Sequence, residues 1–126
     1  MKNSKTANIN IKLKDLFFKW MEITKPFHKL TSQQQDVLAL FLFYHYKYKS
    51  EITNPKILWK VVFDYDTKML IKEELKIKDA GFQNIMSRLR GNGIIENKRI
   101  VSTYVPNLEL KAKDFKIVFN FNIVDG

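Results

Sequence analysis

The chain has 126 residues, of which 45% are apolar, and it contains no cysteine. This size and composition predict one folded domain with an appended arm, and they exclude disulfides, thiolate zinc sites and cysteine nucleophiles. The sequence starts without the apolar run of a signal peptide, and its longest apolar run, VLALFLFY, is far shorter than a membrane span. We therefore expect a soluble intracellular protein.

Positive charge is concentrated in two segments of this chain, whose net charge is +9. Residues 1–30 hold seven lysines against two acids, and residues 67–104 hold eight basic residues against four acids. Such segregation favours a polyanionic partner such as nucleic acid, although a lysine-rich solvated surface or an A/T-rich gene would also raise the lysine content. Codon bias does not account for the arginines, and all three lie in the second segment: Arg88, Arg90 and Arg99.

The first 30 residues contain one predicted strand and one ambiguous segment. Ile9, Ile11 and Leu13 alternate with polar residues in NINIKLK, which is the period of a half-buried strand. The apolar segment DLFFKWMEITKPF fits either a helix or extended chain, and Pro26 should end it. We expect a basic N-terminal strand or arm over residues 1–30.

The clearest helix is predicted from Thr31 to about Tyr48. Thr31 followed by Gln34 is typical of a capping box, in which the two side chains satisfy the first free amides. The aromatic run FYHYKYK could stack on bases, but its helical spacing favours a place in the core. The apolar residues cover more than one stripe of the helix, so it should be buried on more than one side. They are Val37, Leu38, Leu40, Phe41, Leu42, Phe43 and Tyr44.

Two further segments precede the most informative part of the chain. NPKILWKVVFDYD begins with Asn54 as a helix cap and Pro55 at the first helical position, but its end fits a helix or a strand, so residues 55–66 are left open. A short helix capped by Asp66 or Thr67 should then pack the inner residues Leu70, Ile71 and Leu75. The sequence KIK breaks this helix, with Ile77 pointing inward.

The next helix, capped by Asp79 and ending near Arg90, has one apolar and one polar face. At helical pitch, an arc of about 100° contains four residues that must face the core: Phe82, Ile85, Met86 and Leu89. The opposite side has small and hydrogen-bonding residues, with no acid after the cap: Ala80, Asn84, Ser87 and Gly91, flanked by Gln83 and Arg88. Gly93 can then take the left-handed conformation that ends a helix, and GIIENKRIVSTYV predicts a hairpin turning near Asn97 and Lys98.

This order of elements resembles the winged helix-turn-helix family. Family members commonly place apolar residues through both helices and the turn, and a glycine before two closing apolar residues. The segment IKEELKIKDAGFQNIMSRLRGNGII fills these places without a gap: Ile71, Leu75, Ile77, Phe82, Met86, Leu89, Gly93, Ile94 and Ile95. The match covers residues 67 to about 104, and Thr31–Tyr48 would supply the supporting helix.

Two lysines depart from the family pattern. Lys72 replaces the small residue that is usual in the first helix, and it requires either a looser crossing of the helices or a stem that reaches outward. Lys76 replaces the glycine that is usual at the turn, so the turn needs another residue that tolerates its geometry.

The resemblance implies an α+β fold, with a winged helix-turn-helix over residues 31–104 that binds double-stranded DNA. The second helix would enter the major groove, where four side chains would reach base edges: Gln83, Asn84, Ser87 and Arg88. Four cations would contact phosphates or the minor groove: Lys78, Arg90, Lys98 and Arg99. The alternative is an ordinary polar helix face on a fold used for protein contact.

The C-terminal segment, residues 105–126, contains a second alternating pattern in FKIVFNFNIVDG. Its apolar residues recur at every other position: Phe115, Ile117, Phe119, Phe121 and Ile123. We expect this strand to pair with the N-terminal strand or with a neighbouring chain, which would add a small sheet. Because an exposed apolar edge invites association, a homodimer through the terminal strands is attractive.

The sequence disfavours catalysis. Asp64 and Asp66 could hold a metal as in a nuclease, but no third ligand stands nearby, and such a pair is more often a turn and a helix cap. Glu73 and Glu74 are the other carboxylate grouping. The sequence has no phosphate-binding glycine loop, nucleophile elbow or HExxH motif, so we expect no enzyme, cofactor, metal or small-molecule substrate.

The chain as a whole, A/T-biased and with FKIVFNFNI near its end, looks like small winged-helix proteins of bacteriophages. We therefore expect a sequence-specific DNA-binding regulator of a phage or mobile element, acting in the bacterial cytoplasm. The alternative is a structural or assembly protein, for example in a virion or a replication complex, that uses the winged helix for protein contact.

Overall fold

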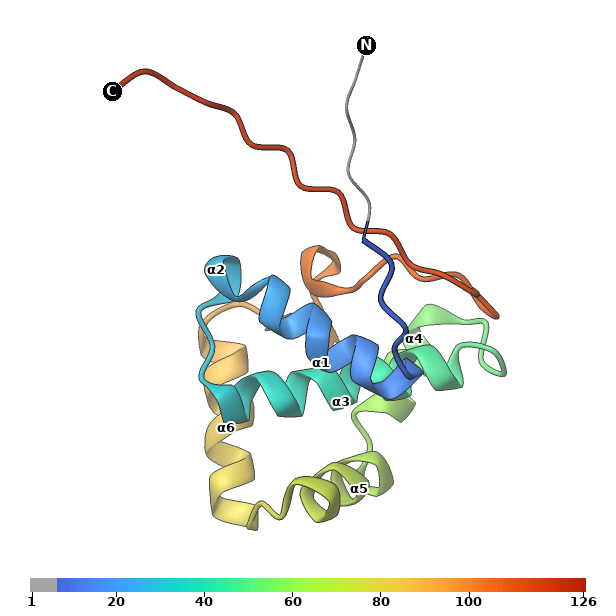
Figure 1. Ribbon diagram of the computed structural model, residues 1–126. Helices are drawn as coiled ribbons and strands as arrows, with labels where there is room; N and C mark the ends of the chain where they lie inside the picture. The colour runs from blue at the N-terminus through green and yellow to red at the C-terminus, as the bar shows by residue number, and fades with distance from the viewer. Residues whose placement is uncertain (1–6) are drawn as a thin grey trace.

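The computed structural model describes residues 7–126, which form six helices and one two-stranded antiparallel sheet (Figure 1). This arrangement is compatible with the expected α+β class. Within the described residues, each helix is too short or too polar to cross a membrane. The elements follow one another as α1 (Leu13–Ile23), α2 (Lys25–His28), α3 (Ser32–Tyr48), α4 (Pro55–Val62), α5 (Tyr65–Leu75), α6 (Asp79–Gly91), β1 (Ile95–Glu96), β2 (Arg99–Ile100) and the 3-10 turn η1 (Ser102–Tyr104).

Helix α3 is the centre of the fold, and it packs against α1, α4, α5 and α6 (Figure 1). The predicted capping box is confirmed: the Gln34 amide donates to Thr31 Oγ1 at 3.3 Å, and the Thr31 amide donates to Gln34 Oε1 at 3.1 Å. The predicted end at Tyr48 is also confirmed. Because neighbours surround α3, apolar residues are buried on more than one of its sides: Val37, Leu38, Ala39, Leu40, Phe41, Leu42 and Tyr44.

The N-terminal strand predicted for NINIKLK is wrong. Residues 7–12 have no regular structure, Ile9 is exposed, and α1 begins at Leu13. The helical period continues through Phe17 and Met21, which are buried against α3, and this burial outweighs the alternation upstream. The first six residues of the expected arm lie outside the described part of the chain.

The open question over residues 55–66 is resolved as two helices. Asn54 Oδ1 accepts hydrogen bonds from the first amides of α4, as its sequence pattern predicts. The cap predicted for α5 is wrong, because Asp64 accepts from the Thr67 amide at 3.0 Å and the helix starts at Tyr65. Thr67 instead donates its buried hydroxyl to the Val61 carbonyl, which ties α5 to the end of α4.

The hairpin after α6 turns where the sequence predicts. Asn97 and Lys98 both have positive φ angles, of 52° and 60°, as a two-residue type I′ turn requires. Glu96 lies opposite Arg99 in the ladder. The following segment, residues 102–110, is held to the helices by three side chains: Trp20 donates to the Tyr104 carbonyl, Tyr46 to the Glu109 carbonyl and Lys49 to the Leu108 carbonyl.

The strand predicted near the C-terminus is not formed in this single chain. Residues 113–126 form no ladder with any described segment, and the chain runs away from the helical body (Figure 1). Phe115 still packs edge-on against Trp20, but Phe121 and Ile123 are 85% and 97% exposed. The small sheet expected from the two termini is therefore absent from the described residues, because an alternating pattern folds as a strand only when a partner completes its hydrogen bonds.

His45 is a half-buried base within this helical body. Its ring stacks on Trp59 of α4, with 4.0 Å between the ring centroids. Burial, and then the nearby Lys49 charge, lowers the pKa of His45 to about 4. Between this value and about 6.5, the unfolded chain binds more protons than the folded chain, so protonation favours unfolding there.

We expect His45→Phe, which keeps a ring against Trp59, to reduce the acid sensitivity of the fold. The wild-type free energy of unfolding should fall as the pH drops from about 6.5 towards 4, and the variant should lose less over that range. Urea unfolding across this pH range measures both profiles. Parallel profiles would show that His45 remains protonated or solvated in the folded state.

Candidate nucleic-acid interface

The turn between α5 and α6 sets the direction of α6 relative to α5. Lys76 ends α5 in the left-handed conformation, with φ of 55°, and the Ile77 amide donates to the Lys72 carbonyl at 3.0 Å. Ile77 is buried, as the sequence predicts. Lys76 therefore takes the backbone role that glycine more often has at a helix end.

Lys72 shows how a long side chain fits where the two helices meet. Its side chain is only 15% exposed, and its ammonium group lies 5.7 Å from the centroid of the Phe82 ring. The same ammonium pairs with the Asp79 carboxylate, so the stem is covered while the charge reaches outward. The predicted cap is wrong at this point: Lys78 is the cap residue of α6, and Asp79 makes no capping bond.

The apolar face of α6 is confirmed. Phe82, Ile85, Met86 and Leu89 are all buried, and Phe82 packs against Phe41 of α3 with 6.3 Å between ring centroids. The predicted outward face is exposed as well, including each of the four residues proposed to reach bases: Gln83, Asn84, Ser87 and Arg88.

Three of those residues share a shallow hollow, which we call the outer hollow. Asn84, Ser87 and Arg88 line it together with Gly91 and Asn92, and its volume is about 590 Å³. Gln83 and the cap residue Lys78 are exposed but do not line this hollow. The outer hollow thus gathers amide, hydroxyl and guanidinium groups that can all donate hydrogen bonds.

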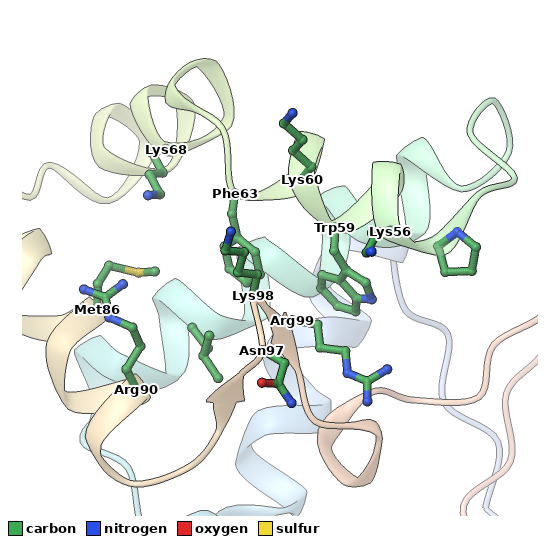
Figure 2. Close-up of a pocket in the computed structure, with 12 residues that line it drawn as sticks. Lys56, Trp59, Lys60, Phe63, Lys68, Met86, Arg90, Asn97, Lys98 and Arg99 are labelled. Atoms are coloured by element: carbon green, nitrogen blue, oxygen red, sulfur yellow. The ribbon is translucent and has the colours of Figure 1, made fainter.

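Three of the other predicted cations lie around a larger groove, of about 920 Å³, which we call the α4–hairpin groove (Figure 2). Helices α4 and α5 border it from one side, and α6 and the hairpin border it from the other (Figure 2). Arg90, Lys98 and Arg99 line it, and so do three lysines that the sequence reasoning missed: Lys56, Lys60 and Lys68.

A sequence signal for two of the missed lysines exists. Lys56 and Lys60 are four residues apart, so they share a face if residues 55–62 are helical. The β-branched run in this segment left helix and strand open, and the surrounding residues 31–66 are neutral overall. The net charge of the longer segment therefore does not reveal the positive face of α4.

Acidic residues do not line either site within the described part of the chain. Asp79 is paired with Lys72, and Glu74 is paired with Lys14 at 2.8 Å. Glu96 lies opposite Arg99 on the hairpin and lines a smaller neighbouring hollow. Both the outer hollow and the α4–hairpin groove are thus suited to negatively charged ligands.

Asp64, one of the two acids considered for a metal site, has a structural role, and so does the buried His28. The Asp64 carboxylate caps α5, and the His28 ring lies between the Met21 carbonyl and the Leu30 amide, with hydrogen bonds to both. Burial lowers the pKa of His28, so its ring stays neutral to lower pH than a free imidazole. The described residues contain no group of three or more His, Cys, Asp or Glu side chains placed to hold a metal.

Comparison of the chain with protein-family models, with curated proteins and with solved structures finds no match. The functions proposed below therefore rest on the chemistry and geometry of this chain.

We expect Lys76→Gly to raise the free energy of unfolding by about 0.5–1 kcal/mol, because glycine avoids the cost of the left-handed conformation. Urea unfolding measures this change. As a matched control, Lys68→Gly removes a lysine inside the same helix and should lower the stability by about 1 kcal/mol. A loss of stability in both variants would contradict the role given to Lys76.

Proposed function

We propose that this protein binds double-stranded DNA as a winged helix-turn-helix, with α6 in the major groove and the β1–β2 hairpin as the wing. The order α3, α5, turn, α6 and hairpin supports this assignment, since it is the order of that family. We further propose that it is a sequence-specific regulator of a phage or mobile element and has no catalytic activity of its own.

The exposed face of α6 is the observation that carries the proposal. Asn84, Ser87 and Arg88 project from one shallow hollow on a helix whose opposite side is buried. Asn and Gln side chains can pair with adenine, and Arg can pair with guanine through two hydrogen bonds. A helix presenting these groups, with its one acid already paired, suits the donors and acceptors of base edges.

The cations around α6 have positions that suit the DNA backbone. Lys78 is at the start of α6, while Lys98 and Arg99 are on the hairpin beyond its end. Arg90 follows Arg88 by two residues, so the two guanidinium groups lie on different sides of the helix. Arg88 would read bases, and the other four would contact phosphates or the minor groove.

We expect Arg88→Ala to weaken binding to a selected DNA site by about 1–3 kcal/mol and to relax the base preference at one position. A gel-shift series at two salt concentrations, after selection of the preferred site from random duplexes, measures both effects. Lys113→Ala is the matched control, because it removes one positive charge from the exposed tail. Equal affinity for the Arg88 variant and the wild type would rule out base reading by Arg88.

A second candidate function is assembly through the C-terminal segment. Phe119, Phe121 and Ile123 are exposed at alternate positions of an extended chain. The backbone N–H and C=O groups of such a segment can pair with another strand, and its alternate side chains offer the partner one apolar face. We propose that the partner is a second copy of this chain, which would make a homodimer with two α6 helices.

We expect the full chain to have the mass of two chains in light scattering, and Phe121→Ser to shift it towards one. Val118→Ser is the control, because Val118 immediately precedes Phe119 and its side chain therefore points to the opposite face of an extended segment. Apolar association should persist in high salt, whereas DNA binding should weaken steeply. A wild-type mass of one chain at all concentrations tested would exclude the dimer.

A further inference from the structure

The α4–hairpin groove combines aromatic rings with positive charge. Trp59 lines it from α4 and Phe63 from the cap that ends this helix, and their rings are nearly parallel, at 18°, with centroids 5.8 Å apart. Both side chains are half-buried, so part of each ring borders the groove and part is held by the core. His45 and Phe41 support these rings from α3, with centroid distances of 4.0 Å to Trp59 and 4.8 Å to Phe63.

Six cations border these rings. They come from α4, α5, α6 and the hairpin: Lys56, Lys60, Lys68, Arg90, Lys98 and Arg99 (Figure 2). None of the six forms an ion pair with a described residue, although lysines elsewhere in the described chain do. Like charges gathered around one groove repel one another, and this repulsion is relieved when an anion enters.

The rings distinguish between two kinds of polyanion. A paired duplex presents phosphates and base edges outward, and its base faces are stacked inside, so it has little use for an aromatic floor. An unpaired strand exposes both its phosphates and its base faces, and proteins bind such strands by combining a positive groove with aromatic side chains. The groove volume, about 920 Å³, lies within the roughly 300–1,000 Å³ of typical ligand sites.

We propose that the α4–hairpin groove binds a short unpaired stretch of nucleic acid, with its phosphates on the surrounding cations and its bases against Trp59 and Phe63. This site goes beyond the duplex contact proposed for the outer hollow. Lys56 and Lys60 belong to the groove alone, so the two activities can be separated.

The test uses the full-length protein and a fluorescein-labelled oligothymidylate of about 12 nucleotides, a length within the range that single-strand sites cover. Fluorescence anisotropy compares the wild type with Lys56→Gln/Lys60→Gln. The matched control, Lys25→Gln/Lys113→Gln, removes the same charge at two exposed positions outside the groove. We expect the groove variant to bind at least tenfold more weakly with a shallower salt dependence, and the control to change less than threefold.

Duplex binding by the same proteins separates this inference from the proposed function. Lys56→Gln/Lys60→Gln should keep the duplex affinity of the matched control, and Arg88→Ala should keep the single-strand affinity of the wild type. Equal losses of single-strand binding in the groove variant and the charge-matched control would overturn the inference, because they would show unlocalised attraction. If the wild type does not bind the single strand but binds the duplex, the inference is overturned and the duplex proposal stands.

Tryptophan fluorescence adds a readout of base contact. Stacking of thymine on Trp59 should quench the emission of the wild type, and Trp59→Phe, which keeps a ring in the floor, should remove that part of the quench. Thymidine monophosphate is the competitor. Equal quenching by this mononucleotide at the same nucleotide concentration would overturn the strand assignment in favour of a free-nucleotide site. An unchanged quench in Trp59→Phe would overturn base contact with Trp59.

Discussion

The burial of one face of α6 against the central helix is the constraint on which the candidate sites depend. Phe82 has no exposed surface and packs against Phe41, and Leu89 is equally buried about two turns further on. Because side chains three and four apart share a helix face, burying this stripe leaves only the opposite side of α6 for contact with a partner. Ile94 and Ile95, also buried, then anchor the hairpin at the end of the same helix. The outer hollow and the groove are both consequences of this packing.

The structure separates lysines that make contacts within the fold from lysines that line a candidate site. The stem of Lys72 is covered where α5 and α6 meet, and Lys76 makes the turn between them in the left-handed conformation. Lys14 pairs with Glu74 and Lys49 holds the Leu108 carbonyl. These side chains use their stems and ammonium groups inside the fold. The net charge of +9 therefore overstates the charge available to a ligand, whereas the cations lining the groove have no ion-pair partner among the described residues.

Sequence reasoning succeeded where the signal was local. The capping box at Thr31 and the apolar stripe of α6 depend on residues within two turns of one another, and both were predicted correctly. The strands predicted for the two alternating segments near the termini are wrong, because a strand forms only with a partner and an alternating apolar pattern does not supply one. The sequence does not predict the groove. It marks Arg90, Lys98 and Arg99 as cations that would contact phosphates or the minor groove, but their meeting with α4 depends on how distant segments pack.

The outer hollow and the α4–hairpin groove are both lined by residues of α6. Arg88 lines the outer hollow and Arg90 lines the groove, so α6 presents neighbouring cations to both. A duplex bound to the outward face of α6 and a strand bound in the α4–hairpin groove would therefore both contact this helix. With both proposals in force, the preferred ligand would be a boundary between paired and unpaired nucleic acid. Binding there would also stabilise the open form of a duplex, since a protein that binds one state more tightly shifts the population towards that state.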